Sequence, residues 1–238
     1  HVVGTIDIGI DDGVHYLVMD YVEGCTLATL LKQQKGKRPY HLIARVLVDA
    51  LNGLHAAHTL VDDHDRPLRL VHRDVSPQNV MVGTDGNGHL TDFGIAKARA
   101  RSTHTDPGIF KGKLGYFAPE LLLDPDGFDH RADIFAAGAV LWMALTGEAL
   151  FDAGSDQLTI TNVVRKEAPP PSTVGLKPPD AFDEVCLKAL AKDPARRYQT
   201  ASHMASALRQ AALDAGLLGS PAEVADWVWS LSGTQIRS

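Results

Sequence analysis

Three short polar motifs follow one another in a set order through the central part of this 238-residue chain. His72-Arg73-Asp74 is followed by Asn79, five residues after the aspartate, then by Asp92-Phe93-Gly94 and by Ala118-Pro119-Glu120. A single tripeptide of this kind arises by chance in about one of every few dozen chains of this size, and alone it would indicate only a turn. Their order and spacing together are far more specific than any one of them.

The hydrophobic pattern predicts an α+β fold that is mostly α. Two runs rich in β-branched residues, 2–10 and 15–21, flank a turn sequence and predict an antiparallel strand pair. A second hairpin is predicted over residues 80–91, and a mobile loop over 99–112. Apolar residues recur at helical spacing in the remaining segments. One helix is expected to begin near Thr26. Further helices are expected over residues 43–54, 132–146, 156–167, 181–191, 200–215 and 222–231.

Charge, hydropathy and cysteine content exclude several classes of protein. The net charge is −6, with 23 basic and 29 acidic residues, and no basic run predicts a nucleic-acid partner. The longest apolar stretch, residues 134–145, is shorter than the ~20 residues that span a bilayer. Only two cysteines, Cys25 and Cys186, are present, which indicates a reducing, cytoplasmic setting rather than a disulfide framework.

With these motifs the chain resembles the eukaryotic-like (Hanks-type) serine/threonine protein kinases, in particular the bacterial ones. Residues 16–24 are similar to the last N-lobe strand and the hinge, 133–151 to the central C-lobe helix, and 192–198 to the late arginine motif. The resemblance implies a C-lobe over residues 25–215 after the last N-lobe strands and hinge over 1–24. Residues 216–238 would form an extra helix, with Ser220 and Glu223 as its capping pair.

The resemblance also implies transfer of the γ-phosphate of ATP, with Mg²⁺, to hydroxyl groups of a protein substrate. Asp74 would accept or orient the proton of the substrate hydroxyl, and Asn79 and Asp92 would hold Mg²⁺ through oxygen atoms. Arg73 would pair with a phosphate on the following loop. The candidate phosphorylation sites there are Ser102, Thr103 and Thr105.

Further roles are implied for the nucleotide pocket and for the frame of the site. The backbone of Asp20 and Val22 would bind the adenine edge, with Met19 as gatekeeper and Met81 as the pocket floor. Asp133 would orient the catalytic loop, and Glu120 with Arg197 would form a buried ion pair. The expected structural residues are His72, Phe93, Gly94, Glu120, Asp133 and Arg197.

Two departures from the family pattern affect these expectations. No Gly-x-Gly-x-x-Gly stands near the start and the first lysine is Lys32, so the chain is expected to be an N-terminally truncated kinase, inactive alone. The family's lysine two residues after the catalytic aspartate is Ser76, and its loop threonine is Lys113. We hypothesise that Lys113 substitutes for the missing lysine. The change leaves the choice between Ser/Thr and Tyr substrates open.

Two alternatives to an active kinase are disfavoured by features of the sequence. A non-catalytic pseudokinase that only binds partners is disfavoured because Asp74, Asn79 and Asp92 are all present. A small-molecule phosphotransferase with a kinase-like lobe is disfavoured by the Ala-Pro-Glu segment and its arginine partner. Trp227 and Trp229 are two residues apart and cannot share one helix face, so one is expected to pack and the other to lie at a partner surface.

Overall fold

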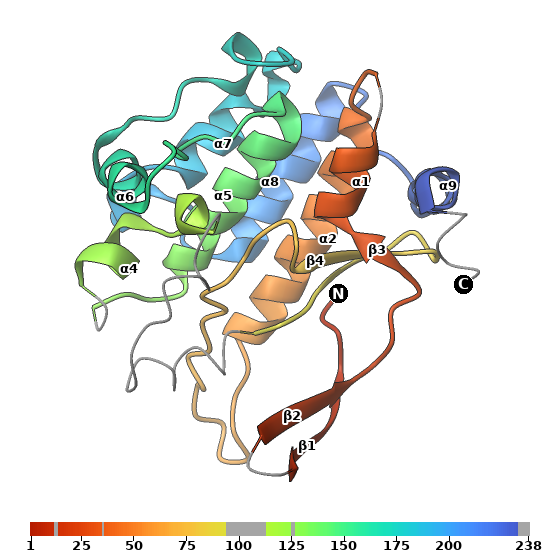
Figure 1. The fold of residues 1–238 in the computed structure, drawn as a ribbon, viewed down its shortest axis with the longest axis vertical. Coiled ribbons are helices and arrows are strands. Elements are labelled where there is room, and N and C mark those ends of the chain that lie inside the picture. Colours follow the sequence, from red (N-terminus) through yellow and green to blue (C-terminus); the bar gives the residue numbers. More distant parts are fainter. Residues whose placement is uncertain (12–13, 35, 94–112, 125–126, 233–238) are drawn as a thin grey trace.

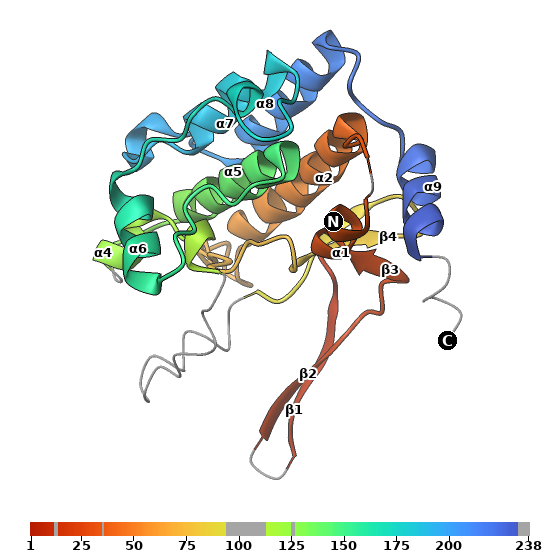
Figure 2. The same cartoon turned by 45° about the horizontal axis from the view of Figure 1, so that its top comes forward.

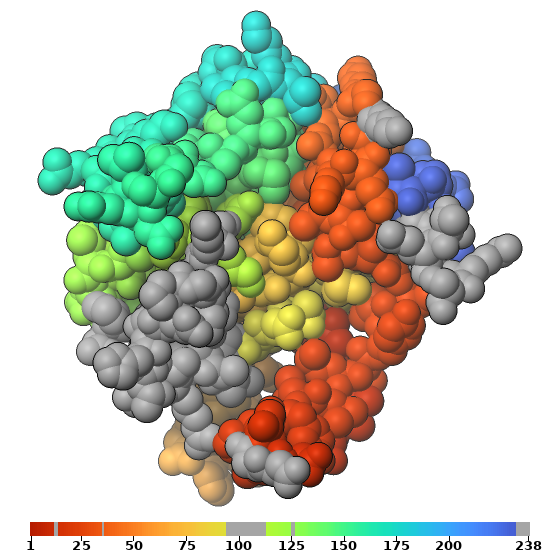
Figure 3. Space-filling model, in the orientation of Figure 1, coloured from red at the N-terminus to blue at the C-terminus, as the bar shows by residue number. Residues whose placement is uncertain are grey.

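The computed structural model describes residues 1–11, 14–34, 36–93, 113–124 and 127–232. A body of helices carries a small three-stranded sheet on one side, and a two-stranded hairpin projects away from this body (Figures 1 and 2). The space-filling view shows the same hairpin standing out from the rest of the molecule (Figure 3). The fold is therefore α+β and mostly α, as the sequence predicts.

The projecting hairpin consists of β1 (Thr5–Asp11) and β2 (Val14–Met19), which pair in antiparallel fashion. This confirms the predicted strand pair. Residues 2 and 3 do not belong to it, because Val2 forms a parallel bridge with Leu90 in the other sheet. Most of the apolar side chains of the hairpin are exposed: Ile6, Ile8, Ile10, Val14, Tyr16, Leu17 and Val18.

The second sheet has the antiparallel order β3-β4-β5, with β3 at Gly24–Thr26, β4 at Val80–Gly83 and β5 at Gly88–Leu90. The predicted hairpin over residues 80–91 is β4 and β5. The sequence did not indicate β3, because three residues are too few to show an alternating pattern. It forms by pairing Cys25 with Val82 across the chain.

The core lies between α2 (Tyr40–His58), α5 (Arg131–Thr146) and α8 (Ala201–Asp214), with α2 in contact with both other helices and with β5. Helix α5 is buried on nearly every side, since 14 of its 16 residues are buried. A helix in this position must be apolar all round, as its sequence is. Its one buried charge is Asp133.

Shorter helices complete the body. They are α1 (Leu27–Gln33), α4 (Pro119–Leu123), α6 (Asp156–Arg165), α7 (Asp183–Ala189) and α9 (Pro221–Ser232), with 3-10 turns η1 (Leu114–Tyr116), η2 (Pro171–Thr173), η3 (Asp180–Phe182) and η4 (Pro194–Arg196). The sequence predicted no helix at α4, whose five residues span little more than one turn. The expected helix over 181–191 is split into η3 and α7. The loop expected over 99–112 lies outside the described residues.

Helix α9 packs against α1, β3 and β4 at the side of the molecule (Figures 1 and 2). Its predicted cap is present: the Glu223 carboxylate accepts the N–H of Ser220 at 2.8 Å, and the Ser220 hydroxyl accepts the N–H of Glu223 at 3.3 Å. Trp227 is buried and donates to Gln34 at 2.9 Å, whereas Trp229 is 44% exposed. Within the described ranges, no helix combines the length and the hydrophobicity needed to cross a membrane.

Candidate active site

The loop that carries His72-Arg73-Asp74 is held by Asp133 of the buried helix α5. The Asp133 carboxylate accepts the backbone N–H of His72 at 2.7 Å and that of Arg73 at 2.8 Å. A carboxylate that accepts two consecutive peptide groups fixes the backbone between them. Arg73 itself adopts a φ of 64°, a conformation that a non-glycine residue adopts only when its surroundings impose it. The contacts are those expected of a residue that orients this loop.

A histidine that the sequence analysis did not single out shares this carboxylate. His58, at the end of α2, places Nε2 2.8 Å from Asp133 Oδ2, and both side chains are buried. No spacing in the sequence connects the two residues, which are 75 positions apart and meet only through the packing of α2 against α5. His58 therefore helps Asp133 to hold the loop in place.

Asp74 is buried, and two donors fix one oxygen of its carboxylate. Asn79 Nδ2 lies 2.8 Å from Asp74 Oδ2 and 2.8 Å from the Asp74 carbonyl oxygen. Lys113 Nζ lies 2.9 Å from the same Oδ2 atom. The structure thus brings together three of the predicted catalytic residues. It gives the carboxylate the defined orientation that a proton acceptor needs.

Asn79 and Asp92 lie at one end of the β4–β5 ladder. Asn79 directly precedes β4, Asp92 follows β5, and the N–H of Thr91 donates to the Asn79 carbonyl at 3.0 Å. The Asn79 amide nitrogen is engaged by Asp74, which leaves its amide oxygen for another ligand, and the Asp92 side chain is exposed. Among the described residues, no three His, Cys, Asp or Glu side chains gather as a metal cage. An amide oxygen and one exposed carboxylate fit Mg²⁺ that is shared with phosphate oxygens.

The His72 ring supports the site through hydrogen bonds to two neighbouring backbone groups. Its Nδ1 accepts the N–H of Asp74 at 3.3 Å, so Nε2 carries the proton that is donated to the Thr91 carbonyl at 3.1 Å. The ring also contacts Phe93, with centroids 4.4 Å apart. Burial lowers the pKa of His72, which keeps the ring neutral. Gly94 lies outside the described residues.

The Arg73 side chain packs on an aromatic ring. Its guanidinium lies 5.0 Å from the centroid of the Phe128 ring. The three candidate phosphorylation sites, Ser102, Thr103 and Thr105, lie outside the described residues. The pairing of Arg73 with a phosphorylated loop residue stays a prediction.

The expected ion pair between α4 and the segment before α8 is present. Arg197 donates to both carboxylate oxygens of Glu120, at 2.6 and 2.8 Å. The guanidinium is buried and also donates to the carbonyl groups of Ala191, Arg131 and Lys192. Arg197 therefore ties three chain segments together.

Of the residues predicted to bind adenine, Asp20 and Val22 lie between β2 and β3. Met19 ends β2, and the N–H of Asp20 donates to the Gly4 carbonyl at 2.9 Å. Asp20 and Val22 border a cleft of about 310 Å³, but Met19 and Met81 are not in its wall. Met81 lies within β4, opposite Thr26. The contact of these four residues with a nucleotide stays a prediction.

Comparison with known proteins assigns this arrangement to a family. The family described as "Protein kinase domain" matches residues 1–208. The chain belongs to the protein kinase family. Membership confirms the resemblance and the fold that the sequence predicted.

Three relatives that are similar to this kinase domain come from bacteria. It is 37% identical over 211 residues to the tyrosine-protein kinase MasK of Myxococcus xanthus, covering 87% of this chain and 32% of that protein. It is 34% identical over 215 residues to the serine/threonine-protein kinase PknL of Mycobacterium tuberculosis, covering 90% and 51%. For PknE of the same species the identity is 36% over 214 residues, covering 89% and 35%. The kinase domain thus spans about a third to a half of the length of these relatives.

Proposed function

We propose that this domain transfers the γ-phosphate of ATP to serine or threonine hydroxyl groups of protein substrates. The observation that carries the proposal is the fixed carboxylate of Asp74, bonded by Asn79 and Lys113 on a loop held by Asp133. Phosphoryl transfer needs placement of the reactants and neutralisation of charge more than covalent help from the protein. A buried, oriented carboxylate beside two oxygen ligands for Mg²⁺ meets both needs.

Each residue has a defined task in this proposal. Asp74 orients the substrate hydroxyl and receives its proton. Asn79 and Asp92 hold Mg²⁺, which, when bound, neutralises the charge of the phosphate groups. Arg73 binds a phosphate on the loop that follows residue 93 and so couples loop phosphorylation to the site.

The proposal also covers the adenine pocket, the domain boundaries, the cellular setting and a partner surface. We propose that the backbone of Asp20 and Val22 binds adenine next to Met19 and Met81. We also propose that residues 1–24 are the last N-lobe strands and the hinge, 25–215 the C-lobe and 216–238 an extra helix. Cys25 and Cys186 form no disulfide with each other, which supports a cytoplasmic setting. The exposed Trp229 of α9 is proposed as part of a partner surface.

The choice of serine or threonine over tyrosine is supported by the names of most of the relatives cited, although MasK is named a tyrosine kinase. The test is transfer of labelled γ-phosphate from ATP to a generic protein substrate, followed by phosphoamino-acid analysis. The kinase is expressed with its native flanking sequence, and its Asp74→Asn variant is the control. Label on serine and threonine in the parent only supports the proposal. Label on tyrosine alone, or equal transfer by the variant, contradicts it.

A further inference from the structure

The site around Asp74 has a serine close to the aspartate in the sequence and a lysine that reaches the same aspartate from a later segment. Ser76, two residues after Asp74, is buried, and its hydroxyl has no hydrogen-bond partner among the described residues. A serine hydroxyl carries no charge, so Ser76 cannot place a positive charge next to a phosphate group near Asp74. Lys113 comes from a segment 37 positions further along and places its ammonium 2.9 Å from Asp74 Oδ2.

The charge of the site makes this ammonium important. Asp74 and Asp92 each contribute a negative charge, and a phosphate group approaching them adds more. Transfer in such a site requires preorganised positive charge where negative charge develops, because the surroundings exclude much of the water that would screen it. The Lys113 side chain is 24% exposed and that of Asp74 only 6%, so the lysine extends from a partly exposed position to the buried carboxylate.

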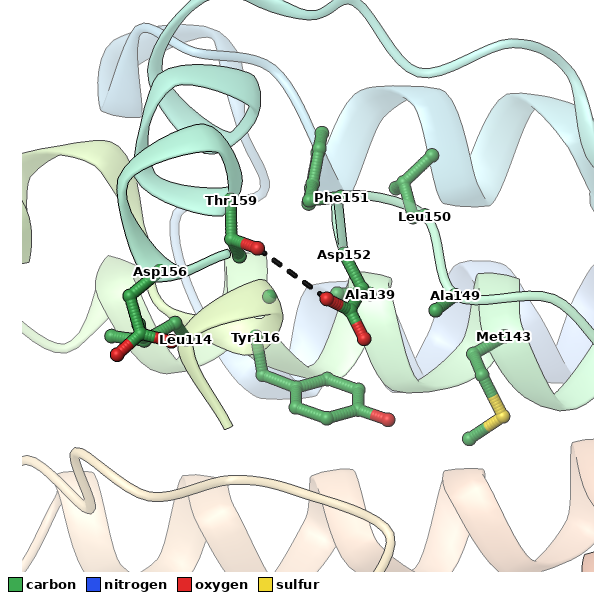
Figure 4. Close-up of a pocket in the computed structure, with 11 residues that line it drawn as sticks. Leu114, Tyr116, Ala139, Met143, Ala149, Leu150, Phe151, Asp152, Asp156 and Thr159 are labelled. Carbon is green, nitrogen blue, oxygen red and sulfur yellow. Dashed lines mark hydrogen bonds between the residues drawn. The ribbon is translucent and has the colours of Figure 1, made fainter. Parts of the chain in front are cut away.

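The position of Lys113 is set by the turn that follows it. Its carbonyl accepts the N–H of Tyr116 at 3.0 Å and so begins η1, which packs against α5 and α6. Figure 4 shows Leu114 of this turn beside Asp156, and Tyr116 next to Asp152. The Asp152 carboxylate accepts a hydrogen bond from the Thr159 hydroxyl at 3.4 Å. Burial and the nearby Asp152 carboxylate raise the pKa of Tyr116 to about 12, in keeping with an enclosed phenol. The turn is therefore seated in the body of the domain and carries Lys113 to Asp74.

We propose that Lys113 is a catalytic residue that contacts the transferring phosphate and orients Asp74, and that it takes this role because Ser76 cannot. The inference rests on the proposed kinase function. It adds that the positive charge of the transfer site is delivered by η1 rather than by the loop that carries Asp74. The site is then complete only when η1 is seated against α5 and α6.

The test is a double-mutant cycle in the kinase with its native flanking sequence, after phosphate transfer by the parent has been established. Failure of the proposed function shows at that first step, before any variant is made. Lys113→Met should lower kcat about 10- to 100-fold with little change in the KM for ATP. Lys113→Arg should retain most of kcat. Lys37→Met, which removes an exposed lysine elsewhere, is the matched control and should leave kcat unchanged.

Moving the charge to the other position separates catalysis from structure. Ser76→Lys with Lys113→Met should recover at least about a third of the parent kcat, whereas Ser76→Lys alone places two like charges together and should lower it. If Lys113 had only a structural role, a lysine at position 76 would not be expected to restore kcat. Additive losses in the double variant, or an unchanged kcat in Lys113→Met, would overturn the proposal.

Lysine at the buried position 76 could prevent folding, so a second route restores the charge at position 113 itself. Lys113→Cys is alkylated with 2-bromoethylamine, which displaces bromide and leaves an ammonium on a chain of lysine's length. Activity should return with this reagent and not with iodoacetamide, which leaves a neutral group. The parent treated in the same way controls for Cys25 and Cys186. Equal activities after the two reagents would contradict the role of the charge.

Discussion

Arg197 and Glu120 form a two-pronged ion pair that joins the segment before α8 to α4, with N–O distances of 2.6 and 2.8 Å. The Arg197 side chain is fully buried, and its guanidinium lies 4.9 Å from the centroid of the Phe135 ring. Its other donors reach three backbone carbonyl groups. The pair is thus part of the frame on which α4 and α5 are set, and a change to it should act on stability.

Replacing Arg197 with methionine should lower the free energy of unfolding by about 3–5 kcal/mol. The substitution leaves the Glu120 carboxylate without its partner and orphans several carbonyl groups. Urea unfolding followed by circular dichroism measures the change. Arg66→Met is the control, because the Arg66 side chain is 73% exposed in its pair with Asp62 and should contribute little to stability. A loss in Arg197→Met no larger than in this control would contradict the structural role.

Asp74→Asn should reduce kcat by at least about 100-fold and leave the fold intact. Asparagine has nearly the same shape but cannot accept the proton of the substrate hydroxyl. Its neutral side chain also loses the charge that attracts Lys113. Steady-state kinetics measure kcat, and the thermal midpoint reports folding. Asp63→Asn, an exposed carboxylate on the loop after α2, is the matched control. Turnover near the parent value in Asp74→Asn would remove Asp74 from the mechanism.

The proximity of Asp74 and Asn79 was easier to predict from the sequence than some elements of the fold, and the reasons are physical. Asp74, Asn79 and Asp92 stand on a hairpin and its flanking loop, where short spacings in the sequence translate directly into short distances. Long helices such as α2 were recognised because their apolar face repeats over many turns. β3 and α4 were missed because each is too short to show a period.

Contacts between distant segments were predictable only where a known family motif marked them. The pair of Arg197 with Glu120 was expected on that basis, and so was the relation of Lys113 to Asp74. His58 carries no such mark, and its contact with Asp133 depends on how α2 crosses α5. The same holds for Asp49, a buried carboxylate on α2 that binds Arg45 at 3.1 Å and the N–H of Gly88 at 3.3 Å. Such partners are set by tertiary packing rather than by local pattern.

Asp92→Asn should raise the Mg²⁺ concentration needed for half-maximal rate and also lower the maximal rate. The side chain keeps one oxygen ligand but loses the charge that attracts a hard cation. Titration of activity with Mg²⁺ at saturating ATP measures both effects. The Asp74→Asn variant provides the contrast, since its defect should not be relieved by more metal. Equal Mg²⁺ requirements in the parent and in Asp92→Asn would exclude Asp92 as a ligand.

His72 should make the stability of the domain fall as the pH drops below about 6.5, the usual pKa of histidine. Burial lowers the pKa of His72 in the folded state, so the ring stays neutral there while the unfolded chain takes up a proton. Unfolding is then favoured by acid, with a limit of about 1.4 kcal/mol per pH unit for one proton. Burial lowers the pKa of His89 too, which acts in the same direction. Lowered carboxylate pKa values, as at Asp129, act only in more acidic solution, near pH 4.

Urea unfolding of the parent and of His72→Gln between pH 5 and 7.5 separates the contribution of His72 from the rest. Glutamine retains an N–H group that can donate to the Thr91 carbonyl but has no proton to gain in this range. The variant should be less stable at pH 7.5, and its stability should depend less steeply on pH by up to one proton. His203→Gln, at an exposed position on α8, should keep the slope of the parent. If the stability of His72→Gln kept the pH dependence of the parent, His72 would have to take up its proton equally well in the folded and the unfolded state. The charged ring could not accept the hydrogen bond from the Asp74 amide.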